Sequence, residues 1–407
     1  MGDALEGVKV VELGGYAAGP GIGKYLANFG AQVLHVESTQ HPDGFRLQYP
    51  PYKDGKVGVN RSGCFAFFSD SKYGVTLNLK HPKGLELGYR LMEWADIVIE
   101  NMRPGVVARL GFGYEALRRR NPGLIMLSTS NLGQTGPHAT HPGFGSQLSS
   151  LSGFCHLIGE PEDPPHMLYG PYIDFIAVAY GGVAALAALD QRRRTGEGAY
   201  IDLSQYESGL QFIGSALLDY STNGAIADRA GNRDPVAAPH GCFPCRDGEW
   251  CVISCWNDEE WERFCRAAKQ TASQSSWLSD TRFRIAADRK ENEEALNQLI
   301  GAWTSDQSAE RVMEHLQASG VHAARVNTMR DLFSDPQIGF RQIWQEQEHP
   351  EIGRHRYRMV SYQLSETPGS VRSPAPCLGE HNEEAFLEWL GMPEEEYREF
   401  REQGVFC

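Results

Sequence analysis

Short apolar runs alternate with amphipathic stretches along the first two hundred residues. The apolar runs are rich in β-branched residues, which favours strands, and they cover residues 8–13, 31–37, 75–79, 96–101, 124–130 and 199–204. The stretches near 20–29, 82–94, 175–190 and 205–222 have the spacing or length of helices. This alternation predicts a Rossmann-like α/β domain with a doubly wound, mostly parallel sheet. Functional residues are then expected on loops at the carboxyl ends of the strands.

The pattern changes after residue 222. A loop rich in Gly, Pro and Asn leads into CFPCRDGEWCVIS, residues 242–254, which reads as an antiparallel hairpin with a turn at Asp247-Gly248. Two Trp-containing helical stretches follow. We therefore expect a smaller α+β domain over 223–325 and a large domain formed by 1–222 and 326–407.

The first turn, GGYAAGPGIGKY, resembles a phosphate-binding loop but fails both common templates. In a P-loop, Ala18 would stand at the first glycine and Tyr25 at the hydroxyl position. In a dinucleotide-binding loop, Lys24 would stand at the third glycine. The pattern of strand, tight turn, helix and strand is typical of an ordinary βαβ unit, and it does not identify a ligand.

Charge and composition narrow the class of protein. The chain carries 52 acidic and 38 basic side chains among 407 residues, a formal charge of −14, which argues against nucleic acid as a partner. The start is acidic and unlike a signal peptide, and the longest apolar run, 175–189, is too short to span a bilayer. We expect a soluble cytoplasmic protein without a membrane partner.

The nine cysteines fit a reducing compartment, because their number is odd and no secretory signal is expected. Four of them, Cys242, Cys245, Cys251 and Cys255, raise the question of a zinc site. Cys251 and Cys255 lie on one expected strand, where side chains four apart are about 13 Å distant. That separation favours small core residues over a single tetrahedral zinc site.

Asp174 is the carboxylate that attracts attention, because it is alone between Asp163 and Asp190 and precedes an apolar helix. It suits a helix N-cap, and a carboxylate stabilised at a helix start could equally act as a nucleophile. His138 and His141 lie in a loop rich in Gly and Pro, where they could be catalytic or simply solvated.

The chain resembles the class III CoA transferases, the group that includes formyl-CoA transferase, carnitine CoA-transferase and the α-methylacyl-CoA racemases. The motifs follow the family's order over nearly the whole chain: LEGVKVVEL with AAGP, LANFGAQVLHVES with DGFR, SKYGVTLNL, IENMRPG, LGFGYEAL with NPGLI, GQTGP, Asp174 with RRRTGEG and IDLSQYE, GCFPCRDGEW, and APCLGEHN. The resemblance implies an interlocked dimer, homomeric or with a related subunit.

The resemblance also implies where coenzyme A binds. The matching positions are Ala17 and Ala18 in the first turn, Leu77, Asn78, Leu79 and Lys80 at the adenosine end, Asn101, Met102 and Arg103 at the pantetheine and phosphates, and Arg109 at phosphate. Cationic side chains suit the phosphates of CoA. Ser38 replaces an arginine that is frequent in the family, so we expect another residue, such as Arg46, to contribute there.

Asp174 matches the family's catalytic aspartate. The implied chemistry proceeds through mixed anhydrides and an aspartyl-CoA thioester, with acyl-CoA and a free carboxylic acid as substrates. CoA is then a substrate, no cofactor is bound permanently and no metal is required. The resemblance makes small dicarboxylates such as succinate plausible donors, as succinyl-CoA. The neighbouring aromatic residues Tyr169, Tyr172, Phe144 and Phe154 suggest a bulky or aromatic acid such as benzylsuccinate as the second substrate.

Two alternatives remain open. Racemase-like relatives carry a His-Asp pair where this chain has Phe144 and Gly145, so an α-methylacyl-CoA racemase would need His141 as a substitute base. Gly145 also replaces an acidic residue of many transferases, which suggests a roomier pocket. The second alternative is a non-catalytic subunit of a heteromeric CoA transferase, against which the presence of Asp174 argues.

Overall fold

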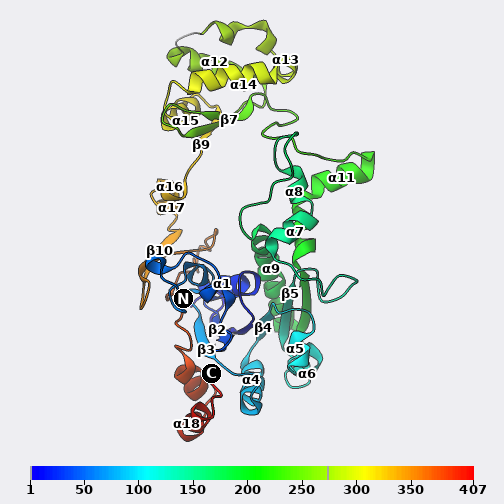
Figure 1. Ribbon diagram of the computed structural model, residues 1–407, viewed down its shortest axis with the longest axis vertical. Helices are drawn as coiled ribbons and strands as arrows, with labels where there is room; N and C mark the ends of the chain where they lie inside the picture. The colour runs from blue at the N-terminus through cyan, green and yellow to red at the C-terminus, as the bar shows by residue number, and fades with distance from the viewer. Residues whose placement is uncertain (1, 273–274) are drawn as a thin grey trace. The chain divides into compact units, whose positions relative to one another are not determined.

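The structure is a computed structural model that describes residues 2–272 and 275–407, and the chain forms two compact units (Figure 1). The first unit comprises Met1–Cys155, Met167–Ile226 and Pro336–Cys407, and the second comprises His156–His166 and Ala227–Asp335. The domain limits expected from the sequence, with the small domain over 223–325, stay a prediction.

A six-stranded parallel sheet forms the centre of the first unit. Its strands are β1 (Lys9–Leu13), β2 (Gln32–Glu37), β3 (Tyr73–Thr76), β4 (Ile97–Glu100), β5 (Ile125–Ser130) and β6 (Ala199–Ser204). Their order is β3-β2-β1-β4-β5-β6, and all neighbours are parallel. The strand order reverses beside β1, which is where ligands bind in such sheets. The expected doubly wound parallel sheet is confirmed.

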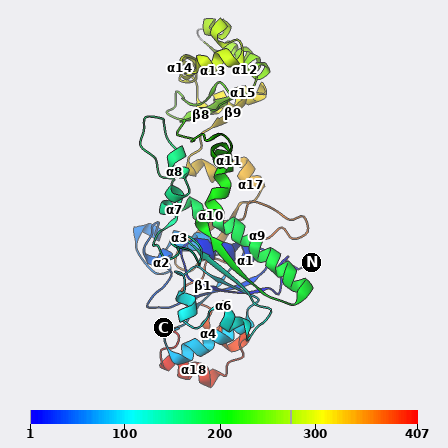
Figure 2. The ribbon, with the colours of Figure 1, turned by 90° about the vertical axis from the view of Figure 1, so that its right-hand side faces the viewer.

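Helices cover both faces of this sheet, because successive strand side chains point to opposite faces. On β1, Val10 joins one apolar core and Val11 the other. The first core includes side chains of α1 (Ala18–Asn28), α3 (Gly63–Ser69) and α9 (Tyr172–Thr195). The second includes those of α4 (Pro82–Trp94), α6 (Tyr114–Arg118) and α18 (Glu394–Glu402), which lie on the opposite side of the sheet in Figure 2.

Two helix predictions need correction. Helix α9 extends beyond the expected 175–190 at both ends. By length and composition alone it could cross a membrane, contrary to the expectation from the shorter apolar run, but half of its most apolar stretch is buried inside the protein. The stretch expected as one helix over 205–222 is divided into α10 (Gln205–Leu210), η2 (Gln211–Ile213) and α11 (Gly214–Asn223). The remaining elements of this unit are α2 (Gly44–Leu47), η1 (Lys53–Gly55), α5 (Val106–Arg109), α7 (Gly145–Leu151), α17 (Pro336–Phe340), β10 (Trp344–His349), β11 (Gly353–Arg358) and η5 (Glu384–Trp389). A short helix, α8 (Phe154–Leu157), runs from the first unit into the second.

The second unit contains the expected hairpin. Strands β7 (His240–Pro244), β8 (Trp250–Ser254) and β9 (His322–Arg325) form an antiparallel sheet in the order β7-β8-β9. Its helices are α12 (Asp258–Thr271), η3 (Ser276–Ser279), η4 (Thr281–Phe283), α13 (Ala286–Glu291), α14 (Glu293–Thr304), α15 (Ala309–Ala318) and α16 (Met329–Leu332). Cys245, Cys251 and Cys255 lie in its apolar core, which confirms the core interpretation for three of the four thiols. Cys242 is only partly buried and lies outside that core, so the interpretation is wrong for this residue.

Candidate active site

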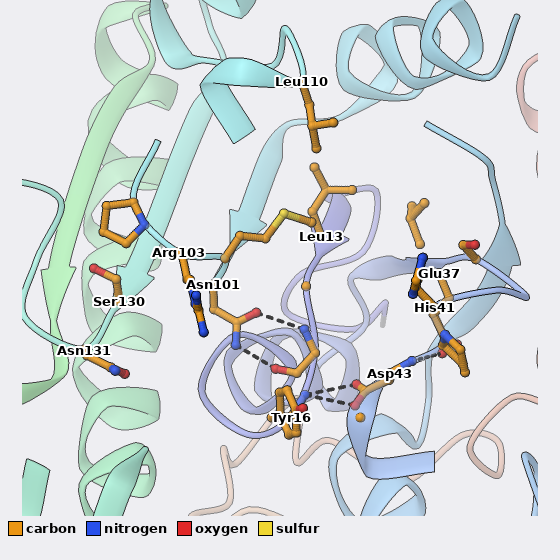
Figure 3. A pocket seen from close by; sticks show the side chains of 18 of the residues that line it. Leu13, Tyr16, Glu37, His41, Asp43, Asn101, Arg103, Leu110, Ser130 and Asn131 are labelled. Atoms are coloured by element: carbon orange, nitrogen blue, oxygen red, sulfur yellow. Dashed lines mark hydrogen bonds between the residues drawn. The ribbon is translucent and has the colours of Figure 1, made fainter. Parts of the chain in front are cut away.

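A pocket of about 830 Å³ opens at the carboxyl ends of the central strands (Figure 3). The segments that follow all six strands contribute to it, as expected for a doubly wound sheet. The lining residues are Leu13–Tyr16 after β1, Val36–Ser38 with Gln40–Gly44, Leu47 and Gln48 after β2, Leu77–Lys80 after β3, Asn101–Pro104 with Leu110 after β4, Ser130, Asn131 and Ala139–Phe144 after β5, and Gln205 after β6, together with Asp174 of α9.

Most of the residues expected to bind CoA or to catalyse its transfer line this one pocket. Those that do are Leu77, Asn78, Leu79, Lys80, Asn101, Met102, Arg103 and Asp174. Ala17 and Ala18 are instead packed into the start of α1 and are almost fully buried. Arg109 lies at the end of α5 and folds back over Gly105 of the same loop. The roles of these three residues stay a prediction.

Asn101 joins two loops of the pocket. Its Oδ1 accepts the backbone N–H of Gly15 at 3.0 Å, and its Nδ2 donates to the carbonyl of Gly15 at 2.6 Å (Figure 3). Gly14 has φ of +119°, and a Cβ at that position would lie 2.0 Å from Asn101 Oδ1. The amide of Asn101 therefore fixes the turn after β1 against the loop after β4.

Tyr16 and Asp43 belong to the pocket but were not singled out from the sequence. Tyr16 has φ of 64°, which is uncommon for a bulky residue, and its N–H donates to both carboxylate oxygens of Asp43 at 3.0 and 3.2 Å. Its hydroxyl donates to Gln48 Oε1 at 2.7 Å, and its ring meets Phe144 edge-on at 5.7 Å. Backbone strain that neighbouring groups hold in place is common at functional sites.

Arg46 does not reach the pocket, so the suggestion that it replaces the arginine absent at position 38 is wrong. Its side chain is fully buried, and its guanidinium donates to both oxygens of Glu37, at 2.8, 3.1 and 2.7 Å. The remaining N–H groups donate to Asn60 and to the carbonyls of Val59 and Pro376. With all of these donors used, Arg46 has a structural role.

Two cationic side chains of the pocket have no internal partner. Among the described residues, Lys80 and Arg103 form no side-chain hydrogen bond or ion pair, and both are exposed. Lys80 follows β3 and Arg103 follows β4, so both cations stand at the edge of the sheet where the pocket opens. A phosphorylated ligand would find charge-assisted donors there.

Asp174 is the third residue of α9, so its prediction as the N-cap is wrong. The helix begins at Tyr172, the N-cap position is Pro171, and in the described part of the chain no side chain makes a capping hydrogen bond there. The Oδ2 atom of Asp174 is buried and has no hydrogen-bond partner within the described part of the chain. Burial raises the pKa of Asp174 to about 7, and a backbone N–H opposes that rise only in part.

Two buried polar residues at the ends of β5 and β6 also line the pocket. Ser130 ends β5 and Gln205 follows β6, and both are buried and line the pocket. The Ser130 Oγ atom has no partner among the described residues. Strand ends at the sheet edge were expected to be functional, but nothing in the sequence singled out these two residues.

Comparison with known proteins agrees with this site. Residues 5–382 match CoA-transferase family III. A succinyl-CoA–D-citramalate CoA-transferase of Chloroflexus aurantiacus is 35% identical over 392 residues, which are 96% of this chain and 95% of that protein. The β subunit of a succinyl-CoA–L-malate CoA-transferase of the same organism is 33% identical over 407 residues, 98% of each chain.

The fold has a close counterpart among solved structures. A CaiB/BaiF family protein from Brucella suis superposes with a TM-score of 0.88 and is 29% identical, and the match covers 96% of this chain and all of the other. The sequence resemblance to class III CoA transferases is thereby confirmed. The chain belongs to CoA-transferase family III and is a CoA transferase.

Proposed function

We propose that this protein transfers CoA from an acyl-CoA thioester to a free carboxylic acid, with Asp174 as the nucleophile. The position of Asp174 carries the proposal: its carboxyl group lines the pocket, one of its oxygens is buried without a partner among the described residues, and its pKa is raised to about 7. A poorly solvated and more basic carboxylate is a better nucleophile than a hydrated one. At neutral pH a large fraction of such a group is still ionised.

The reaction balances without a metal, a redox partner or a net proton. The Asp174 carboxylate attacks the thioester carbonyl, the carbon–sulfur bond breaks, and a mixed anhydride and CoA thiolate form. The thiolate then attacks the Asp174 carbonyl carbon, which releases the first acid and leaves an aspartyl-CoA thioester. The second acid repeats these steps in reverse, so a new acyl-CoA leaves and the Asp174 carboxylate is restored.

The CoA moiety is placed by the unpaired cations. Lys80 and Arg103 are available for phosphate oxygens, and the backbone turns held by Asn101 and Asp43 bring Gly14 and Gly15 close to the ligand. Arg109 can support the same loop through Gly105. In this proposal CoA is a substrate that enters and leaves in each cycle.

For the acids, we propose succinyl-CoA as donor and a carboxylic acid as acceptor. The two relatives described above are named for succinyl-CoA with citramalate or malate. Of the four aromatic residues that suggested an aromatic acceptor, Phe144 lines the pocket, whereas Tyr169, Tyr172 and Phe154 do not. Tyr16, which was not among the four, also lines the pocket, and its ring meets that of Phe144 edge-on. This pair favours including a bulky acid such as benzylsuccinate beside small hydroxydicarboxylates when acceptors are screened.

We further propose that the protein acts in the cytoplasm as an interlocked dimer. Helix α9 exposes Tyr180, Val183 and Leu186, and α11 exposes Leu218 and Tyr220, an apolar surface that a second copy would cover. The nine cysteines are free thiols, as a reducing compartment would leave them. Light scattering on the purified protein should give the mass of two copies, whereas a monomer that is active alone would contradict the dimer.

The transferase proposal is tested by incubating purified protein with succinyl-CoA and a panel of acids, and by following new thioesters chromatographically. The wild type should form them, and Asp174→Ala should not. Asp190→Ala is a matched control on the same helix, because Asp190 is exposed and pairs only with Arg194 within the described residues. Hydroxylamine added with succinyl-CoA should modify Asp174 in the wild type, and transfer by Asp174→Ala at the wild-type rate would refute the proposal.

A further inference from the structure

Gly145, the first residue of α7, lies directly against the carboxyl group of Asp174. A Cβ placed on Gly145 would lie 2.1 Å from Asp174 Oδ2 and 3.0 and 3.1 Å from Pro171 Cα and Cβ. A carbon cannot approach an oxygen to 2.1 Å without displacing it. The expectation that Gly145 leaves a roomier pocket is therefore wrong, because Asp174 and Pro171 fill the space where a side chain would begin.

The backbone on both sides of this contact is held by hydrogen bonds. The carbonyl of Gly145 accepts the buried hydroxyl of Ser149 at 2.9 Å, and the N–H of the preceding Phe144 donates to Gln147 Oε1 at 3.0 Å. On the other side, the N–H of Asp174 donates to the carbonyl of Pro171 at 3.1 Å, which begins a helix of 24 residues. A side chain at position 145 would have to move either a packed backbone or the carboxyl.

The carboxyl is the softer of the two, because its χ angles can change while the backbone stays in place. In the structure, its Oδ2 is the oxygen that is buried without a partner. Turned away from Gly145, this oxygen would leave its buried position for the pocket that Asp174 lines. A Cβ at position 145 would thus change both the direction of the carboxyl and its contact with solvent.

We propose that Gly145 is the positioning residue of the nucleophile: the missing Cβ lets Asp174 turn Oδ2 against α7, so that the other oxygen attacks the thioester. The inference rests on the proposed role of Asp174. Glycine at position 145 is then required in this active site, because Asp174 Oδ2 is held by packing against α7 rather than by a hydrogen bond within the described residues.

The kinetic test compares Gly145→Ala with the wild type, using hydroxylamine labelling of Asp174 by succinyl-CoA. A displaced nucleophile should lower the labelling rate by about a hundredfold, while CoA affinity measured by calorimetry stays within about twofold. The pH midpoint of labelling should be lower than that of the wild type, because a turned-out, hydrated carboxyl loses the burial that raises the pKa of Asp174. The matched control is Gly182→Ala on α9, where the nearest atom to an added Cβ, Tyr25 Cδ2, is 4.0 Å away.

A second measurement does not depend on activity. Melting temperatures are compared for the wild type, Gly145→Ala, Asp174→Ala and the double variant. If the methyl group collides with the carboxyl, Gly145→Ala should destabilise the wild type strongly and the Asp174→Ala background much less. A Gly145→Ala protein that folds only when Asp174 is also replaced would support the same contact.

Labelling of Gly145→Ala at the wild-type rate would overturn the inference, and so would additive melting temperatures. A wild type that is never labelled would instead count against Asp174 as the nucleophile. In that case the melting temperatures still decide whether Gly145 positions this carboxyl.

Discussion

His35 and Glu12 form a buried pair on neighbouring strands of the central sheet, with His35 Nδ1 2.6 Å from Glu12 Oε1 and both side chains fully buried. Glu37 and Asp43 lie within 3.8 and 3.6 Å of the other ring nitrogen. The cluster also contains Lys72, bound to Glu12, and Arg46, bound to Glu37. The cluster therefore contains three carboxylates and two cations besides His35, and protonation of His35 brings its net charge to zero.

The cluster supports the pocket through Asp43, which holds the N–H of Tyr16. Burial acts to lower the pKa of His35, but the carboxylates of Glu37, Glu12 and Asp43 outweigh it, so the pKa is raised. Replacing His35 by Gln keeps a hydrogen-bond donor but removes the charge. We expect a loss of about 3 kcal/mol in the free energy of unfolding, the scale for breaking a buried ion pair.

The pH dependence of this loss has a definite sign. Because folding raises the His35 pKa above 6.5, its stabilisation is complete below that pH and is lost as pH rises through the folded-state pKa. Urea unfolding should therefore show a larger gap between wild type and His35→Gln at pH 6 than at pH 9. His41→Gln, at an exposed position, serves as control, and a gap that grows with pH would contradict a charged His35.

Asp174→Asn tests the raised pKa of the proposed nucleophile without any substrate. Folding raises this pKa from 3.8 to about 7, so stability from the protonated carboxyl is complete below pH 3.8 and is lost as pH rises toward 7. The side chain of Asn does not titrate, so the variant does not lose this stability as pH rises. Thermal unfolding should show equal stability near pH 4 and a variant that becomes relatively more stable up to about pH 7, then constant. Asp190→Asn on the same helix should show no such trend, and parallel curves would mean that Asp174 is hydrated.

The sheet could be predicted from the sequence because its strands are short apolar runs separated by helical segments, and the loops at their carboxyl ends do line the pocket. The strand expected over 75–79 shows where this reasoning stops. Leu77 and Leu79 continue the alternation, but the chain leaves the β3 ladder after Thr76. The N–H of Leu77 still donates to the backbone carbonyl of Glu37 on β2, but that of Asn78 donates to the carbonyl of Val405, which is far away in the sequence.

The contacts that shape the site could not be predicted from the sequence either, because they also join residues that are far apart along the chain. The spacing of apolar and polar residues does not predict that Arg46 forms an ion pair with Glu37, or that Gly145 lies against Asp174. The N-cap prediction for Asp174 failed because the helix begins two residues earlier, at Tyr172. Asp43 carries a weak local signal, since an Asp-Gly pair after a strand predicts a turn, but its hold on Tyr16 depends on tertiary packing.

The cations at the pocket edge should control affinity more than rate. Arg103→Gln and Lys80→Gln each remove a charge that has no partner inside the described protein, so folding should be unaffected. We expect the KM for acyl-CoA to rise about tenfold with little change in kcat, as for loss of uniform binding. Arg109→Gln should raise KM less, because Arg109 does not line the pocket. Equal affinities by calorimetry for wild type and Arg103→Gln would place the phosphates elsewhere.

Phe144 and Gly145 also separate CoA transfer from racemisation. Proton exchange at an α-carbon needs a base on one face and an acid on the other. Asp174 can supply one of them, but Phe144 carries no titratable group and the space beyond Gly145 is filled by Asp174 itself. His141 lines the same pocket, so it is the group that would have to supply the second.

Incubation with a chiral 2-methylacyl-CoA in D₂O therefore discriminates the two reactions. We expect CoA to move to a free acid while no deuterium appears at the α-carbon at a competitive rate, because a single carboxylate suffices for transfer and not for two-sided proton exchange. Mass spectrometry of the thioester measures both products in one sample. Rapid deuterium incorporation without CoA exchange would show that the racemase alternative is correct. Loss of that incorporation in His141→Ala would then identify the second base.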